Sequence, residues 1–218
     1  MTESQQIKVL NLYAGIGGNR KLWTKENTGL DLQITAVELD PNIAKIYKDF
    51  FPDDEVIVGD AHQYLLDHYK EFDFIWASPP CPTHSRLRYA QKNKWKPRYP
   101  DMRLYQEIIF LNGFFGGKWV IENVISWYDP LIRPNEIGRH YYWANFFILP
   151  FKGKKQIIAN KPTGQNTYNY RASLVNTEIK NFYEYDGDKR TLIANMVEPE
   201  ISLHIFNSMN NQELKLNL

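Results

Sequence analysis

The sequence has 218 residues, of which 43% are hydrophobic and 15% aromatic, and a formal net charge of +1. A chain of this length can bury one sizeable core, and this composition excludes disordered and fibrous proteins. No apolar run reaches membrane-spanning length and the polar start lacks a secretory signal, so we expect a cytoplasmic protein with no membrane partner. The single cysteine, Cys81, cannot form an internal disulfide and is either a small core residue or a reactive group.

The first half of the chain alternates segments that have the patterns of strands and helices. We expect strands at residues 8–14, 32–39, 55–58, 72–77, 118–121 and 141–149. We expect helices after the glycine-rich residues 15–18 as far as residue 25, from residue 41 to about 50, at 62–71, around 104–115 and at 193–209. Such alternation predicts an α/β fold in which helices cover both faces of a mostly parallel sheet. Ligands of such folds bind beyond the carboxyl ends of the strands.

The alternation stops after residue 149, where the sequence becomes rich in Asn, Lys, Tyr and Gly. We therefore expect one domain at residues 1–149 and a small irregular recognition or connecting segment at 150–189. We expect residues 190–218 to form a helix that returns to this domain and ends in a loose tail.

A glycine turn and two acidic residues follow the first three predicted strands. Gly15, Gly17 and Gly18 allow the backbone to approach a ligand closely, although such glycines also form simple tight turns. Glu38 is placed to bind ribose hydroxyls and Asp60 to accept from an adenine amino group. Each acid can instead cap a helix or lie in solvent. Because the third glycine of the dinucleotide fingerprint is absent, the pattern favours S-adenosylmethionine over a nicotinamide cofactor.

Basic residues concentrate in the segment that follows Cys81. They are Arg86, Arg88, Lys92, Lys94, Lys96, Arg98 and Arg103. A stretch of this kind, interleaved with aromatic residues, is typical of segments that meet phosphates and unstacked bases. By itself it is equally compatible with a solvated loop.

Several short motifs occur in the order found in DNA (cytosine-5) methyltransferases. They are Asn-Leu-Tyr-Ala-Gly-Ile-Gly-Gly at 11–18, Glu-Leu-Asp at 38–40, Gly-Asp at 59–60, Ser-Pro-Pro-Cys at 78–81, Ile-Glu-Asn-Val at 121–124, Arg-His-Tyr-Tyr-Trp-Ala-Asn at 139–145 and Ala-Asn-Met-Val at 194–197. The chain therefore resembles a short member of this family over residues 8–149 and 190–206. The resemblance implies the Rossmann-like fold of S-adenosylmethionine-dependent methyltransferases.

The resemblance implies a role in catalysis for three residues. Cys81 would add as a thiolate to carbon 6 of cytosine, which activates carbon 5 toward a methyl sulfonium. Glu122 would supply a proton or hydrogen bond at ring nitrogen 3. Arg139 would hold the pyrimidine oxygen or stabilise the thiolate. Taken singly, each has a structural alternative, namely a core cysteine, a capping acid or a surface ion pair.

The resemblance also implies two sets of binding residues. The cofactor set, for S-adenosyl-L-methionine and its product S-adenosyl-L-homocysteine, is Tyr13, Ala14, Gly15, Gly17, Gly18, Glu38, Leu39, Asp60, Ala61, Pro79 and Asn195. The nucleic-acid set is His84, Ser85, Arg86, Arg88, Lys92 and Lys94. The loop from 82 to 100 is expected to close over a base rotated out of the duplex.

The predicted function is methylation of carbon 5 of cytosine in duplex DNA, in the cytoplasm of a bacterium or a phage-infected cell. Two alternatives stay open: a tRNA or RNA cytosine-5 methyltransferase, and a non-catalytic relative that binds nucleic acid. A donor other than unmodified adenosylmethionine is also compatible with the sequence. Only about 40 residues, 150–189, replace the family's large recognition region, so a partner protein could assist target recognition. Two further departures are Ala194 in place of a usual glycine and Ile137 where many members carry a second arginine.

Overall fold

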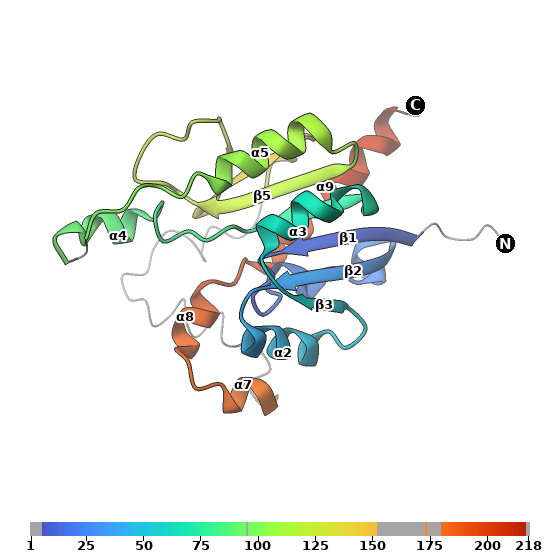
Figure 1. The fold of residues 1–218 in the computed structure, drawn as a ribbon. Coiled ribbons are helices and arrows are strands. Elements are labelled where there is room, and N and C mark those ends of the chain that lie inside the picture. The colour runs from blue at the N-terminus through green and yellow to red at the C-terminus, as the bar shows by residue number, and fades with distance from the viewer. Residues whose placement is uncertain (1–5, 95, 152–172, 174–179, 217–218) are drawn as a thin grey trace.

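The fold is built on one seven-stranded sheet in the computed structural model, which describes residues 6–94, 96–151, 173 and 180–216. Its order is β3-β2-β1-β4-β5-β7-β6 (Figure 1). The strands are β1 (Gln6–Leu12), β2 (Asp31–Glu38), β3 (Glu55–Val58), β4 (Phe74–Ala77), β5 (Lys118–Val124), β6 (Asn135–Ile137) and β7 (His140–Ala144). The first five strands run parallel, and β7 is antiparallel to both β5 and β6. The predicted α/β class with a mostly parallel sheet is confirmed.

Helices cover both faces of this sheet. They are α1 (Lys25–Thr28), α2 (Pro41–Phe50), α3 (Ala61–His68), α4 (Arg86–Ala90), α5 (Arg103–Phe114), α7 (Lys180–Glu184), α8 (Lys189–Ala194) and α9 (Pro199–Leu216), with the 3-10 helices η1 (Asn19–Leu22), η2 (Tyr69–Glu71) and η3 (Lys92–Lys94). Figure 1 shows α3 and α5 in front of the sheet and α9 behind it. No helix in the described part of the chain is long and apolar enough to cross a membrane.

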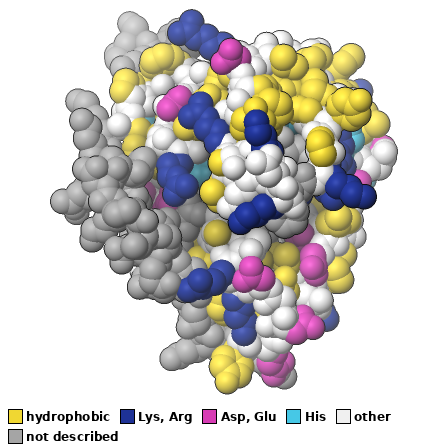
Figure 2. Space-filling view, turned by 90° about the vertical axis from the view of Figure 1, so that its left-hand side faces the viewer, with side chains coloured by type: hydrophobic (Ala, Val, Ile, Leu, Met, Phe, Trp, Pro, Cys, Tyr) yellow, Lys and Arg dark blue, Asp and Glu magenta, His cyan; other side chains and the backbone are white. Residues whose placement is uncertain are grey.

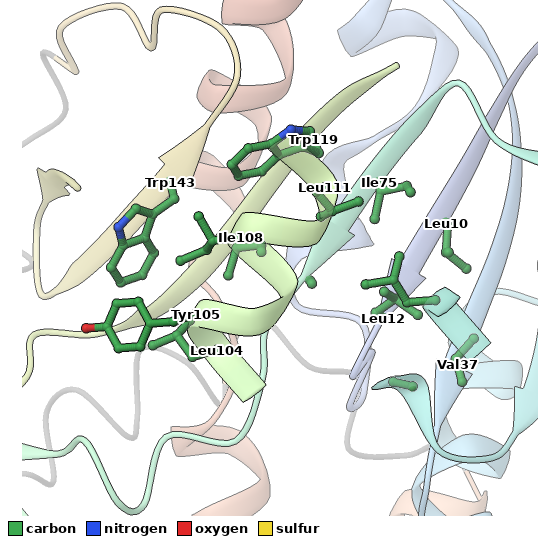
Figure 3. Close-up of a cluster of buried hydrophobic side chains, with 14 of the residues drawn as sticks. Leu10, Leu12, Val37, Ile75, Leu104, Tyr105, Ile108, Leu111, Trp119 and Trp143 are labelled. Carbon is green, nitrogen blue, oxygen red and sulfur yellow. The ribbon is translucent and has the colours of Figure 1, made fainter. Parts of the chain in front are cut away.

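The core has a layer on each face of the sheet because side chains alternate along each strand. Leu10 and Leu12 of β1 face α5, where they pack with Ile108 and Leu111 (Figure 3). Val9 points to the other face and packs with Trp23 and α9. All four residues of β4 are buried, as expected of a central strand in a parallel sheet.

The sheet order has its switch point between β1 and β4. From β1 the chain moves outward through β2 to β3, and it returns on the other side of β1 to form β4. Because the loops after β1 and β4 leave in opposite directions, a crevice opens at their carboxyl ends. The glycine turn follows β1 and the Cys81 loop follows β4, so both predicted motifs meet at this crevice.

Several predicted elements differ in extent. After the glycine turn the chain forms only η1 and the short α1, since Gly29 ends α1 with a φ of +72°. Strand β5 continues through Val124, so the Glu-Asn-Val motif lies within it. Strand β7 ends at Ala144, and the backbone N–H of Leu149 donates instead to Ser208 of α9.

The expected helix at 193–209 is two helices. Helix α8 ends at Ala194, and α9 starts at Pro199, whose fixed φ suits the first position of a helix. The backbone of α9 continues to Leu216, where a loose tail was expected. Most of the predicted recognition segment at 150–189 lies outside the described residues.

Candidate active site

A cavity of about 400 Å³ lies at the switch point. The residues predicted from the sequence that line it are Tyr13, Ala14, Gly15, Gly18, Glu38, Pro79, Cys81, Glu122 and Asn195. They come from the loops after β1 and β4, from β2 and β5 themselves and from the junction of α8 and α9. The structure therefore brings most of the predicted cofactor set into one space with Cys81 and Glu122.

Glu38 connects the glycine turn to the loop that follows β2. Its Oε2 accepts a hydrogen bond from the Gly15 backbone N–H at 2.9 Å, and its Oε1 accepts from the Asp40 N–H at 3.0 Å. Gly15 adopts a left-handed conformation, with a φ of +54°, which favours glycine. Each carboxylate oxygen can accept a further hydrogen bond, so Glu38 is oriented and still able to bind ribose hydroxyls.

Gly17 and Gly18 allow close packing behind the turn. A Cβ on Gly17 would lie 2.2 Å from Phe51 Cε2, and its φ of +79° is left-handed. A Cβ on Gly18 would lie 2.7 Å from the carbonyl oxygen of Val197. Gly17 therefore shapes the turn against α2 without lining the cavity, whereas Gly18 does both.

Besides Gly17, three members of the predicted cofactor set do not line this cavity. Leu39 is exposed and Ala61 is buried. Asp60 Oδ1 accepts from the His62 N–H at 2.8 Å and thereby caps α3. Asp60 thus acts as a helix cap, the alternative that the sequence left open. An acid directly before a helix accepts hydrogen bonds from backbone N–H groups of the first turn that otherwise lack a partner. A cofactor contact of these three residues stays a prediction.

Tyr13 is held by a buried acid that the sequence analysis did not identify. Its hydroxyl donates to Glu107 of α5, whose side chain is 1% exposed. His62 Nδ1 lies 2.8 Å from the same Glu107 oxygen. Burial and the Glu107 charge raise the pKa of Tyr13 well above its ordinary value, and the hydrogen bond to Glu107 raises the pKa of His62. In the sequence, Glu107 could have been recognised as an acid on the apolar face of the helix that also carries Leu104 and Ile108.

Cys81 lies in a rigid loop tied to the neighbouring strand. Asn123 Nδ2 donates to the Pro79 carbonyl at 2.9 Å, and Asn123 is 2% exposed. The amide thus joins the loop after β4 to the middle of the Glu-Asn-Val motif. Burial, and secondarily the charge of Glu122, raise the pKa of the Cys81 thiol to about 11. At neutral pH the thiol is therefore protonated.

Glu122 has His140, and not Arg139, as its neighbour on β7. The His140 Nε2 lies 3.7 Å from Glu122 Oε1, and both residues line the cavity. Arg139 is exposed in the turn between β6 and β7 and does not line the cavity. Adjacent residues of an extended chain point in opposite directions, so bringing His140 toward Glu122 turns Arg139 away. The structure thus adds His140 to the site, and a role for Arg139 at the pyrimidine stays a prediction.

The loop after the cysteine is fastened to the segment that follows β5. Ser85 and Ser126 form an antiparallel bridge, and Arg86 Nε donates to the Ser126 carbonyl at 2.9 Å. Trp127 Nε1 donates to the Thr83 carbonyl at 3.0 Å. Ser85 is half-buried, and Arg86 is exposed yet bonded to backbone. These contacts give the loop a defined position beside Cys81.

His84 is the buried member of the predicted nucleic-acid set. Its side chain is buried, with Nδ1 2.5 Å from the Tyr128 hydroxyl. The side chain is 1% exposed in this conformation, and a contact of His84 with nucleic acid stays a prediction. Burial lowers the pKa of His84, which favours the neutral ring. The remaining members, Arg88, Lys92 and Lys94, lie in α4 and η3 at the surface.

Comparison with known sequences identifies a family and a relative. Residues 7–124 match the model of the C-5 cytosine-specific DNA methylase. A tRNA (cytosine(38)-C(5))-methyltransferase of Spodoptera frugiperda is 34% identical over 82 residues, which are 36% of this chain and 24% of that protein.

Comparison with solved structures finds methyltransferases among the similar folds. The Entamoeba histolytica methyltransferase EhMeth has a TM-score of 0.45 at 16% identity, covering 73% of this chain and 58% of its own. A mutant of Spodoptera frugiperda DNMT2 has a TM-score of 0.43 at 26% identity, covering 72% of this chain and 56% of its own. The chain thus spans little more than half of these structures and 24% of the curated relative. Because the family model matches residues 7–124, more than half of its length, the chain belongs to the C-5 cytosine-specific DNA methylase family.

Proposed function

We propose that this chain transfers a methyl group from S-adenosylmethionine to carbon 5 of a cytosine in duplex DNA through a covalent adduct at Cys81. The observation that carries the proposal is the shared cavity of Cys81 and Glu122, in which the Glu122 charge is close enough to raise the pKa of the thiol. The glycine turn and Glu38 line the same cavity. The cavity therefore contains a nucleophile, Cys81, a group that can carry a proton, Glu122, and residues suited to bind the cofactor.

The residues present fit S-adenosylmethionine. The volume of about 400 Å³ lies within the roughly 300–1,000 Å³ usual for small-molecule sites. Glu38 offers an oriented carboxylate for ribose hydroxyls, and a Cβ on Gly15 would meet nothing within 4 Å, so the turn is open on that side. The ring of Tyr13 lines the cavity and is held by Glu107. When bound, S-adenosylmethionine supplies an electrophilic methyl group.

Transfer of one proton from Cys81 through Glu122 to the base accounts for addition of Cys81 to the cytosine ring. The Glu122 carboxylate takes the thiol proton, which leaves a thiolate and a neutral carboxylic acid. The thiolate forms the Sγ–C6 bond, and the displaced ring electrons draw the same proton from Glu122 to nitrogen 3. After methylation, carbon 5 loses its proton to a base and the Sγ–C6 bond breaks to release the thiolate. The proton on nitrogen 3 returns through Glu122 to Cys81, which restores both residues and releases 5-methylcytosine.

A specific observation favours a second substrate, tRNA. The Spodoptera frugiperda relative, 34% identical over 82 residues, is a tRNA (cytosine(38)-C(5))-methyltransferase. An unpaired cytosine in an RNA loop presents the same ring atoms as a cytosine rotated out of a duplex. The proton transfers described above are the same for cytosine in DNA and in tRNA.

A trapping experiment tests both candidates. The protein is mixed with S-adenosylmethionine and either duplex DNA or tRNA that contains 5-fluorocytosine, because fluorine at carbon 5 cannot leave as a proton. We expect a denaturation-resistant adduct with DNA that maps to Cys81 by mass spectrometry and is absent in Cys81→Ser.

Each outcome of the trapping experiment assigns a substrate or rejects the chemistry. An adduct with tRNA and none with DNA would replace the first candidate by the second. No adduct with either would contradict covalent cytosine chemistry. Binding of radiolabelled S-adenosylmethionine, measured in parallel, shows that each preparation is folded.

A further inference from the structure

A second groove, of about 260 Å³, lies beside the candidate active site. It is bounded by α4, η3, residues 97–98 and Trp127, and we call it the basic groove. Pro82 lines both this groove and the larger cavity, so the two spaces adjoin. The groove is smaller than the roughly 300–1,000 Å³ of typical small-molecule sites, which suits one unit of a longer ligand.

The charge of the basic groove is positive. The described residues that line it include Arg88, Lys92, Lys96 and Arg98 and no acidic residue. Figure 2 shows Lys and Arg side chains over the middle and upper part of the face that carries α4, whereas Asp and Glu side chains lie mostly lower on that face. Such a cluster attracts phosphate groups, and its attraction falls as salt rises.

The groove also contains a flat aromatic stack. The rings of Tyr89 and Trp127 lie parallel, with centroids 4.6 Å apart and an interplanar angle of 5°. Tyr89 is 44% exposed, and Lys92 Nζ lies over its ring at 4.9 Å from the centroid. A nucleobase can take the place of the ammonium over the ring, which lets Lys92 turn to a phosphate. Stacking on such a ring accepts any base, because every base has a flat face.

The stack is fixed relative to the nucleophile. Trp127 donates to two carbonyls of the loop, from Nε1 to Thr83 and from its backbone N–H to His84, each at 3.0 Å. The His84 N–H in turn donates to the carbonyl of Cys81 at 3.0 Å. Tyr89 therefore lies on a platform connected to Cys81 by a continuous chain of hydrogen bonds.

We propose that the basic groove binds the nucleotide next to the target cytosine on the same strand, with its base stacked on Tyr89 and its phosphate held by Arg88 and Arg98. This inference rests on the proposed function, which places the target base beside Cys81. The ligand chemistry, an unstacked base with a phosphate, is common to DNA and RNA, and both are used as separate probes. The groove would thus bind the neighbouring nucleotide whatever its base, and so position the strand without selecting a sequence.

The test compares base-dependent binding in matched variants. Labelled DNA and RNA oligonucleotides carry a single cytosine, placed in the sequence found by trapping or, where no adduct forms, in a random sequence. The nucleotide on its 5′ or 3′ side is either normal or abasic. Tyr89→Leu should raise the Kd of the normal probe roughly tenfold, and should have no effect on the probe that is abasic on the contacted side. Tyr89→Phe should bind like wild type. Tyr99→Leu, which changes a 95% exposed tyrosine outside the groove, is the matched control.

Each outcome decides the proposal. An equal loss with normal and abasic probes, or no loss in Tyr89→Leu, would overturn the nucleotide assignment. A base-dependent loss only with RNA or only with DNA assigns the source. If wild type forms no covalent adduct yet Tyr89→Leu shows the base-dependent loss, the proposed chemistry fails while the groove remains a nucleotide site.

A salt titration tests the phosphate contact independently. Arg98→Ala should lower the slope of log Kd against log salt by about 0.7 to 0.9, which corresponds to one phosphate. Lys45→Ala, which removes an exposed cation on α2 far along the chain from the groove, should leave the slope unchanged. Equal slopes in wild type and Arg98→Ala would exclude a phosphate at this position.

Discussion

The two walls of the main cavity are built from contacts of different range. At the ends of β1 and β2, Glu38 binds Gly15 and Asp40, which are 23 and 2 residues away in the sequence. At the ends of β4 and β5, Asn123 binds Pro79 and Trp127 binds Thr83, each across 44 residues. The first wall forms once a turn and two strands are in place, whereas the second needs two strand-end segments in register. We therefore expect changes in the first wall to affect cofactor affinity and changes in the second to affect chemistry.

The largest effect is expected for Cys81→Ser. A serine hydroxyl is far less ionised than a thiol at neutral pH, so methyl transfer should fall at least about a thousandfold. The Kd for S-adenosylmethionine should change by less than about twofold, since Cys81 lies in the other wall. Single-turnover methylation and isothermal calorimetry measure the two quantities. A parallel loss of cofactor affinity would contradict the separation of the walls.

A smaller loss of turnover, about 10²-fold, is expected for Glu122→Gln, because an amide cannot take the thiol proton and deliver it to the base. The same variant should make Cys81 more acidic. The charge of Glu122 contributes to the raised pKa of the thiol, so its removal lowers that pKa. Alkylation by iodoacetamide should thus occur at lower pH in Glu122→Gln than in wild type. An unchanged alkylation profile would show that Glu122 does not act on the thiol.

A change in the first wall should have the opposite signature. Glu38→Gln weakens a charge-assisted acceptor, and the Kd for S-adenosylmethionine should rise about tenfold or more. With saturating cofactor, turnover should stay within about threefold of wild type. Asp60→Asn is the matched comparison, since Asp60 caps α3 and does not line the cavity. An equal rise in the Kd for S-adenosylmethionine in both variants would support the predicted contact of Asp60 with the adenine amino group and contradict a purely capping role.

The sequence predicts the residues of the first wall well because local backbone geometry fixes their place. A strand that stops at glycines, with an acid at the end of the next strand, specifies neighbouring strand ends in a parallel sheet. Cys81 and Glu122 were predicted as catalytic residues from the resemblance of their motifs to those of the cytosine-5 methyltransferase family. The shortened helix after the glycine turn was missed, because helix-compatible residues do not show where a turn packs against α2 and α9.

Other features depend on contacts that sequence patterns do not encode. His84 stands in a basic, polar stretch, yet it is buried because Tyr128, 44 residues later, packs against it. The orientation of His140 toward Glu122 depends on the register of β7 with β5, in which Glu122 pairs with Tyr142. A one-residue shift of that register would exchange the directions of Arg139 and His140.

The smallest expected effect concerns His62 of α3 and Glu107 of α5, which contact each other beside Tyr13. The hydrogen bond to Glu107 raises the pKa of His62, with smaller effects from Arg103 and Asp60. The protonated form therefore stabilises the fold fully below the ordinary histidine pKa of 6.5, and this contribution is lost as pH rises through the raised value. His62→Gln should accordingly lower the Tm more at about pH 6 than at about pH 8.5, by roughly 1–2 °C given the partial exposure of the side chain. His68→Gln, which changes the more exposed histidine at the end of α3, is the control for general histidine titration in thermal unfolding scans. An identical Tm difference at both pH values would show that the Glu107 carboxylate holds Tyr13 alone, without a charged partner on α3.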